Sequence, residues 1–331
     1  MSVRATTADP QHAVSASARR PRATLTILRK VGIALFVVWG AVTLIFILIR
    51  IAPGDTAVAL LGPTASQEQL DALRLRLGLN DSVLQQYWIY LSGVVTGDFG
   101  DSVRLGRPAM QAVLERLPAT LQLTFSAALI AVVAGIPLGV VAGRRPGGVI
   151  DRSVSAGALV VKSIPAFWLG IMLILLFARL LRILPSFGSG SLLHLILPAV
   201  TLALPFLAIV IRLMRSSVVE ALGEPYVQAA RSKGISERAI LAGHVVPNSL
   251  LPVVTLIGLQ LGTLLGGAVV TESVFSWPGI GLLLVQSVAA RDYVVVQAIA
   301  VVVAVMVVVI NLLTDLLYGR LDPRIRVGGR L

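Results

Sequence analysis

Six long apolar segments divide this chain, and their length decides what it can fold into. A helix that crosses a bilayer needs about 20 consecutive, mostly apolar residues. Inside lipid, every backbone polar group must find its partner within the protein, so an isolated apolar segment of that length forms a helix. The segments lie at about 31–51, 119–143, 156–183, 193–214, 249–272 and 295–318. The sequence therefore predicts an all-α polytopic membrane protein with six transmembrane helices.

Composition supports this prediction and excludes a soluble protein. The chain is 56% hydrophobic and only 13% charged, which is more apolar than a soluble chain of 331 residues needs to be. The first apolar segment follows Arg29 and Lys30 and is too long for a cleaved signal peptide, and no small-residue cleavage site comes after it. We therefore expect this segment to be retained as a helix.

The placement of Lys and Arg predicts the orientation in the membrane. Basic residues cluster in the N-terminal region, in the loops after the second and fourth apolar segments, and at the C-terminus. With six crossings, all four regions lie on one side, and an excess of Lys and Arg marks the cytoplasmic side. Both termini are then cytoplasmic, 1–30 is a disordered basic tail and 215–248 is a cytoplasmic loop. The net charge of +12 is thus a topology signal, and we expect no nucleic-acid partner.

The region 52–118 leans acidic and is expected to be an extracytoplasmic insertion. Ser66 and Gln69 have the spacing of a capping box ahead of a leucine-lined helix that ends near Gly78. A second helix is expected from about Asp81. Four apolar or aromatic residues at helical spacing lie on one side of it: Leu84, Tyr87, Trp88 and Leu91. The residues 97–102 read as a turn rather than a cation site, because their spacing is not that of a calcium loop.

The loop after the fourth apolar segment contains a short polar helix. Pro225 suits its first turn, and Gly234 suits its end. Ser236 can cap a second helix that runs toward Pro247. The first helix presents Tyr226 beside small alanines, and an aromatic side chain with small neighbours fits a groove on a partner protein.

Two glycine series recur every fourth residue within the apolar segments. One is Gly135, Gly139 and Gly143, and the other is Gly258, Gly262 and Gly266. Such rows let helix backbones approach closely. The second row has two readings: it packs helices together, or, with Gln260, it lines a path or slides at a subunit interface.

The sequence gives no support for catalysis, metal binding, proton relay or nucleotide binding by this chain. The chain has no Cys, and its three His lie far apart, at His12, His194 and His244. No acidic residue lies in the middle of an apolar segment to relay protons, and no glycine-rich phosphate loop with a Lys is present. A non-catalytic chain whose energy comes from another protein fits better than an enzyme or an ion-coupled secondary carrier.

A resemblance to a known family rests on an ordered set of motifs. Gln228-Ala-Ala-x-x-x-Gly234 followed by Pro247 resembles the EAA loop of bacterial ABC-importer permeases, although Gln228 stands where the family prefers Glu. Further motifs are similar to those of the dipeptide, oligopeptide and nickel permeases, and the long loop after the first span is typical of the B-type subunit. The motifs are Arg50-Ile-Ala-Pro-Gly-Asp55, Leu77-Gly-Leu-Asn80, Gly97-Asp-Phe-Gly-Asp-Ser102, Phe275-Ser-Trp-Pro-Gly-Ile-Gly281, Arg291-Asp-Tyr293 and Asn311-Leu-Leu-Thr-Asp-Leu-Leu-Tyr318.

The resemblance implies a type I ABC importer permease fold over 31–331, in the bacterial inner membrane, without a cofactor of its own. Its implied partners are a C-type permease subunit, two cytoplasmic ATPases that hold ATP and Mg²⁺, and an extracytoplasmic binding protein. Dipeptides or oligopeptides are the expected cargo, with nickel or glutathione-like compounds as alternatives. The implied ATPase-coupling residues are Tyr226, Gln228, Ala229, Ala230, Arg231, Lys233, Gly234, His244 and Pro247. The candidates for a pathway or gate are Gly258, Gln260, Gly262, Gly266, Glu272, Trp277 and Asn311.

Overall fold

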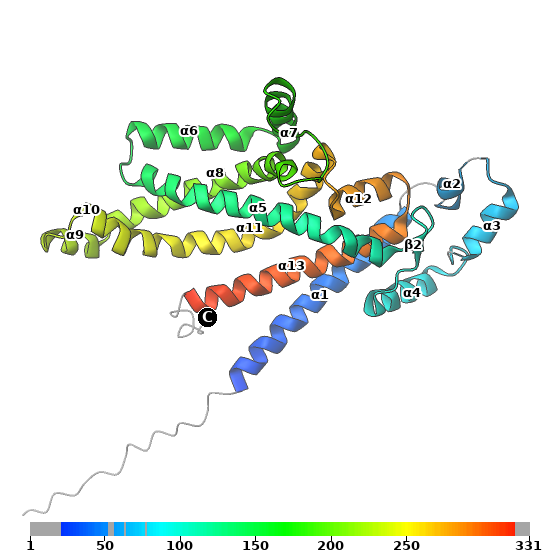
Figure 1. The fold of residues 1–331 in the computed structure, drawn as a ribbon. Helices are drawn as coiled ribbons and strands as arrows, with labels where there is room; N and C mark the ends of the chain where they lie inside the picture. The colour runs from blue at the N-terminus through cyan, green and yellow to red at the C-terminus, as the bar shows by residue number, and fades with distance from the viewer. Residues whose placement is uncertain (1–20, 52–55, 63, 77, 322–331) are drawn as a thin grey trace, which may run out of the picture.

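A computed structural model describes residues 21–51, 56–62, 64–76 and 78–321, and most of them are helical (Figure 1). The predicted tail up to residue 20, residues 52–55 and the end of the chain from 322 lie outside the described residues. The helices are α1 (Pro21–Ile51), α2 (Thr56–Leu61), α3 (Gln67–Arg76), α4 (Val83–Thr96), α5 (Ala109–Gly143), α6 (Val149–Ser163), α7 (Ala166–Leu173), α8 (Leu193–Gly223), α9 (Pro225–Ser232), α10 (Glu237–Ile240), α11 (Val246–Phe275), α12 (Ile280–Ala289) and α13 (Tyr293–Leu321). Wider π-helical turns continue α7 over Ile174–Leu180 and join α10 to α11 over Leu241–Val245.

Five helical stretches are long and apolar enough to cross a membrane, and a bent helix pair is the sixth candidate. The five are Val31–Ile51, Ala109–Gly143, Leu193–Gly223, Glu237–Phe275 and Tyr293–Thr314. The expected single span at 156–183 is instead two helices, Val149–Ser163 and Ala166–Leu180, which meet at 104°. The break lies at Ile164, whose backbone is extended because the following Pro165 disfavours the helical conformation of the residue before it.

The helices also extend beyond the predicted spans. Residues 21–30, expected to be disordered, form the first turns of α1. Helix α5 begins at Ala109, ten residues before the predicted span, and continues through Pro118 and Pro137. The insertion between the first two spans is correspondingly shorter than 52–118.

The core forms where α5 and α8 lie side by side, with α11 packed against both (Figure 1). Every residue of the first glycine row faces α8. A β-carbon added at Gly135, Gly139 or Gly143 would lie only 2.6–2.8 Å from its nearest neighbour, on Val210, Met214 or Arg215 respectively. The predicted close approach of helix backbones along this row is confirmed.

The small helices at one end of the bundle are both capped, and the cap of the first of them was predicted. The Ser66 hydroxyl accepts a hydrogen bond from the Gln69 N–H (3.2 Å), and Leu70 and Leu73 of α3 are buried. Helix α4 begins after Ser82, whose side chain caps it together with Gln85. The predicted face of α4 is divided, since Tyr87 packs on Phe46 of α1 whereas Trp88 is 62% exposed.

The turn after α4 leads into a small antiparallel hairpin. Its strands are β1 (Asp101–Ser102) and β2 (Arg107–Pro108). The hairpin joins α4 to the start of α5 and lies near the start of α13, where the Ser102 hydroxyl donates to the buried Asp292 carboxylate. This end of the molecule is the one opposite to α9 (Figure 1).

Candidate functional site

The short polar helix expected in the loop after α8 is present as α9. It has Pro225 in its first turn and ends at Ser232, and Gly234 adopts a φ of +76° just beyond it. The Ser236 hydroxyl then accepts a hydrogen bond from the Ala239 N–H and caps α10. The sequence signals for both helices are confirmed.

One face of α9 is buried against the bundle, and the other is exposed. Val227 is fully buried and Ala230 is 7% exposed, and both belong to the same core cluster as Ile240 and Val245. Tyr226 is 37% exposed, and Gln228 and Ala229 are also exposed. Ala230 therefore packs within the chain rather than beside Tyr226 and Ala229 on the outer face. This packing ties α9 to the end of α8 directly, and to the start of α11 through α10 and the π-helical turn, within one apolar cluster (Figure 1).

Some of the charged side chains around α9 already form an ion pair within the chain. The Arg231 guanidinium donates to both oxygens of the Glu237 carboxylate, at 2.8 and 3.2 Å. This hydrogen bonding raises the pKa of Arg231, which stays positively charged. Lys233 is exposed, and its side chain makes no ion pair within the described part of the chain. Lys233, directly after α9, is thus available to an acidic partner.

Two further predicted coupling residues lie at the start of the helix that follows. His244 and Pro247 are both exposed, where the chain passes from the π-helical turn into α11. The His244 carbonyl accepts a hydrogen bond from the Asn248 amide (2.7 Å), and Pro247 lies in the first turn of α11, directly after the π-helical turn. Both residues are placed at the same end of the bundle as α9.

A buried ion pair supports this end of the bundle and was not predicted. Asp151, at the start of α6, is 4% exposed and accepts hydrogen bonds from Arg215 Nε (2.7 Å) and Nη2 (2.8 Å). It also accepts from the Gly147 N–H at 2.8 Å. The only sequence signal was an isolated acid among the arginines of the 144–152 loop, and counting charges for topology overlooked it.

The glycines of the second row, on α11, differ in how closely they pack against other helices. Gly258 packs against α13, since an added β-carbon would lie 2.0 Å from Thr314. Gly262 and Gly266 face space in which no described atom lies within 4 Å. The neighbouring Gln260 accepts a hydrogen bond from the Thr263 hydroxyl (2.7 Å), and Asn311 of α13 is exposed. The packing reading of this row is thus found at Gly258, and the reading of Gly262 and Gly266 as part of a path or subunit interface stays a prediction.

Glu272, near the end of α11, is fully buried among groups of its own chain. Its carboxylate accepts a hydrogen bond from the Thr120 hydroxyl of α5 (2.6 Å) and another from the Leu282 N–H of α12 (2.9 Å). The Thr120 oxygen in turn accepts from the Ile280 N–H (2.9 Å). A single carboxylate thereby connects α5, α11 and α12, and it is not open to a pathway in this conformation.

The residues between α11 and α12 pack closely around this carboxylate. Trp277 is 2% exposed and donates its indole N–H to the Ala119 carbonyl at 2.9 Å. A β-carbon at Gly279 would lie 2.2 Å from a Glu272 oxygen, and one at Gly281 would lie 2.6 Å from the Val269 backbone. The glycines of this motif are therefore required by close packing, and Trp277 is an anchor within the protein.

The bundle of long apolar helices defines the class of protein, a multi-pass α-helical membrane protein. The chain belongs to the family of binding-protein-dependent transport system inner membrane components: the family model matches residues 135–327, and the model for the N-terminal part of these components matches residues 24–124. Membership in this family implies an ATPase and a substrate-binding protein as partners.

Named relatives cover nearly the whole chain. It is 39% identical over 316 residues to a probable peptide ABC transporter permease protein, y4tP, of Sinorhizobium fredii, covering 93% of this chain and 98% of that one. It is 38% identical over 332 residues to the dipeptide transport system permease protein DppB of Escherichia coli strain K12, covering 91% and 98%. It is 40% identical over 283 residues to the glutathione transport system permease protein GsiC of the same strain, covering 86% and 92%.

Solved structures show the same fold. The methionine ABC transporter MetNI in an inward-facing conformation gives a TM-score of 0.54 at 22% identity and covers 64% of this chain and 97% of that one. An amino acid ABC transporter with histidines gives 0.51 at 21% identity, covering 63% and 94%. The expected ABC importer permease fold is confirmed.

Proposed function

We propose that this chain is the transmembrane permease subunit of an ATP-driven importer for dipeptides and oligopeptides, with glutathione-like peptides as the second candidate cargo. The relatives named for peptide, dipeptide and glutathione transport support this choice of cargo. The chain itself performs no catalysis, and ATP and Mg²⁺ bind to two partner ATPases. A C-type permease subunit completes the pathway, and a binding protein delivers substrate from outside.

The observation that carries the proposal is the two-faced helix α9. Its buried face, Val227 and Ala230, packs into the core cluster that also contains residues of α8 and α11. Its outer face, with Tyr226 and Ala229, is free to enter a groove on an ATPase, and Lys233 beside it can meet an acid there. A displacement of α9 by the ATPase is transmitted to two long helices at once. Coupling then rests on shape at Tyr226 and Ala229, since Gln228 carries no charge.

Transport follows from alternating access with both termini in the cytoplasm. ATP binding draws the two ATPases together, moves the seated α9 helices and opens the pathway outward, and hydrolysis restores the inward-open state. Such a shift requires the ATPases to bind the two states with different affinity. Gly262 and Gly266 on α11 supply a face without steric obstruction for the second permease subunit or for the pathway.

The proposal is tested by reconstituting the chain with its partner subunits and binding protein in proteoliposomes and measuring uptake of a labelled dipeptide. We expect uptake that requires ATP and continues when ionophores collapse all ion gradients. Uptake that follows an ion gradient and needs no ATPase would contradict the proposal and support a secondary carrier.

Replacing Gly234 by valine should uncouple ATP turnover from uptake while leaving membrane insertion intact. The residue has a φ of +76°, and no described atom lies within 4 Å of an added β-carbon, so the backbone conformation is the sole obstacle. A left-handed conformation costs a residue with a β-carbon about 1–2 kcal/mol, and more for a β-branched one, which lowers the ratio of correctly placed to displaced α9 about 5- to 30-fold. Uptake per ATP hydrolysed measures this loss.

The matched control is Gly234→Asn, because asparagine tolerates the left-handed region. We expect this variant to keep most of the coupling. Equal uptake per ATP in the valine variant and the unchanged protein would show that the geometry after α9 does not govern coupling.

A further inference from the structure

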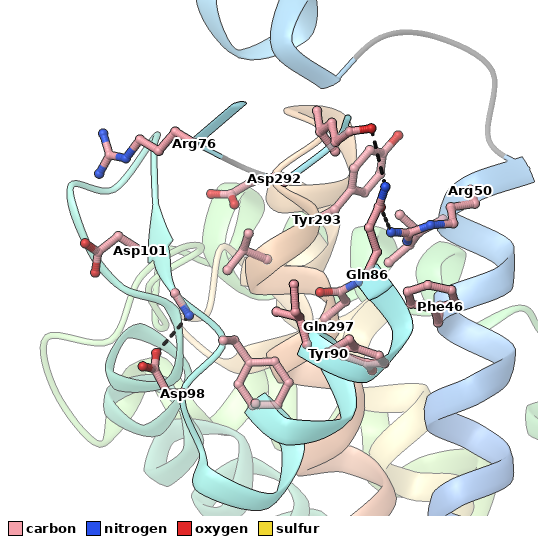
Figure 2. A pocket seen from close by; sticks show the side chains of 18 of the residues that line it. Phe46, Arg50, Arg76, Gln86, Tyr90, Asp98, Asp101, Asp292, Tyr293 and Gln297 are labelled. Carbon is pink, nitrogen blue, oxygen red and sulfur yellow. Dashed lines mark hydrogen bonds between the residues drawn. The ribbon is translucent and has the colours of Figure 1, made fainter. Parts of the chain in front are cut away.

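A large pocket opens at the end of the bundle opposite to α9. Its volume is about 860 Å³, and it lies between the end of α1, helix α4, the turn after α4 and the start of α13 (Figures 1 and 2). Pockets of about 300–1,000 Å³ are of the size that holds small molecules. None of the residues assigned above to coupling or to the α11 face lines it.

The acidic side chains Asp98 and Asp101 lie on one wall of this pocket, and Arg50 lies on the facing wall. Figure 2 also shows Arg76 on the same side as Asp101, so that the acidic wall carries one cation beside its two carboxylates. Asp101 is exposed, and its carboxylate makes no hydrogen bond or ion pair within the described part of the chain. Asp98 uses one oxygen for the Gly100 N–H at 3.0 Å, which leaves the other available. This wall can therefore accept hydrogen bonds from a cationic group.

The guanidinium of Arg50 is held in position on the facing wall. It lies 3.8 Å from the centre of the Phe46 ring and donates to the Gln86 side chain. The Gln86 amide is itself fixed by the backbone carbonyls of Leu79 (3.3 Å) and Asp81 (2.8 Å). Within the described residues, one of the five N–H donors of Arg50 is used, for Gln86, so the others can bind a carboxylate in a fixed geometry.

Between the charged walls lies an aromatic surface with an unsatisfied hydroxyl. The Tyr90 ring stacks on Phe46 at 5.7 Å and meets Phe99 edge-on at 6.1 Å. Tyr90 is 6% exposed, and its hydroxyl finds no hydrogen-bond partner among the described residues. Burial, and to a lesser extent the neighbouring Tyr87, raises the pKa of Tyr90, so the group is a neutral phenol. A buried polar group without a partner is uncommon and marks a place where a ligand or water completes the bonding.

We propose that this pocket binds the zwitterionic backbone of a short peptide, with the α-ammonium group at Asp98 and Asp101 and the terminal carboxylate at Arg50. The inference rests on the proposed function and names a subsite through which cargo passes on the outer side. The backbone of a dipeptide is at most about 7 Å long, and a pocket of about 860 Å³ has room for it together with its side chains. A metal ion does not fit the chemistry, because no group of three or more metal-ligating side chains occurs within the described residues, and Asp292 is already bonded by Ser102.

The test measures binding of L-alanyl-L-alanine to the complete complex in nanodiscs without the binding protein. N-acetyl and C-amide derivatives of the same dipeptide are the comparison probes. The unchanged complex should bind the free dipeptide about tenfold more tightly than either derivative, because each modification removes one charge-assisted contact. Asp101→Asn should weaken dipeptide binding about tenfold and remove most of the penalty for acetylation, while the penalty for amidation remains.

Arg50→Gln should show the reverse pattern, with loss of the penalty for amidation alone. A purely structural role of Arg50 would lower binding of all three probes equally, so this selectivity separates the two roles. Glu68→Gln is the matched control: it lies on the exposed surface of α3, outside the pocket, and should leave all three affinities unchanged.

Two outcomes would overturn the inference: no binding of the dipeptide to the unchanged complex, or an unchanged acetylation penalty in Asp101→Asn. If ATP-dependent uptake with the binding protein is normal in either case, the proposed function stands and only the subsite is wrong. If the unchanged complex shows no ATP-dependent uptake at all, the proposed function itself is contradicted.

Discussion

Glu272→Ala should abolish uptake and markedly lower the thermal stability of the purified permease. The carboxylate is fully buried and accepts hydrogen bonds from the Thr120 hydroxyl and the Leu282 N–H. Its removal leaves two buried donors without an acceptor, at about 1–3 kcal/mol each, and an unfilled space beside Gly279 and Gly281. The total of several kcal/mol is a large fraction of the net stability of a typical protein domain. The loss is measured as the unfolding temperature in detergent and as uptake by the reconstituted complex.

Glu272→Gln separates the lost hydrogen bonds from the lost volume. Glutamine fills the same space and keeps one oxygen for Thr120, but its amide group then presents N–H donors to the Leu282 N–H. We expect an unfolding temperature between those of the alanine variant and the unchanged protein. Glu68→Ala, on the exposed surface of α3, is the control for loss of an acidic side chain. An alanine variant with full uptake and an unchanged unfolding temperature would show that Glu272 does not hold α5, α11 and α12 together.

Local signals in the sequence predicted the local structure well. The helix α9, its exit at Gly234 and the caps at Ser66 and Ser236 depend on residues within a few positions of one another, and all are found in the structure. These features were predictable because backbone geometry and capping hydrogen bonds are decided over short stretches of chain. The same holds for the family motifs, which are short and ordered along the chain.

Contacts between distant residues were not predictable in this way. Glu272 near a span end was a candidate for the pathway or a gate, but its partner Thr120 is 152 positions away in the chain. The Asp151–Arg215 pair spans 64 positions, and in the sequence both residues only contributed to a charge count. A residue's neighbours across the bundle depend on the packing of whole helices, and no local pattern encodes that packing.

Hydropathy and residue spacing also do not determine where a helix is broken or which neighbouring helix one of its faces contacts. The apolar segment 156–183 is interrupted at Pro165, whereas Pro118, Pro137, Pro198 and Pro205 lie within continuous helices. The two glycine rows have the same spacing, yet the first faces α8 throughout and the second faces α13 only at Gly258. Spacing shows that residues share a helix face; it does not show what lies opposite that face.

Gly139→Leu should prevent stable packing of α5 on α8, and this is the second large effect that we expect. A β-carbon there would lie 2.6 Å from Met214 Cβ and 2.8 Å from the Ile211 carbonyl oxygen. A rotamer change of Met214 does not relieve contact with its own β-carbon or with a backbone oxygen, so the helices must separate. Overpacking of this kind costs about 1–3 kcal/mol or more, whereas leucine gains less than about 1 kcal/mol over glycine in helix propensity. The free-energy cost of overpacking therefore exceeds the gain from the higher helix propensity of leucine.

Gly157→Leu is the matched control, because Gly157 lies on the exposed side of α6 with no described atom within 4 Å of an added β-carbon. The isolated chain carrying this change should unfold in detergent at or slightly above the temperature of the unchanged protein, whereas Gly139→Leu should unfold at a clearly lower temperature and accumulate poorly in membranes. Equal unfolding temperatures for the two variants would mean that α5 and α8 can move apart at little cost. In that case the glycine row would not fix the distance between the helices, and α8 would be free to move relative to α5 when α9 is displaced.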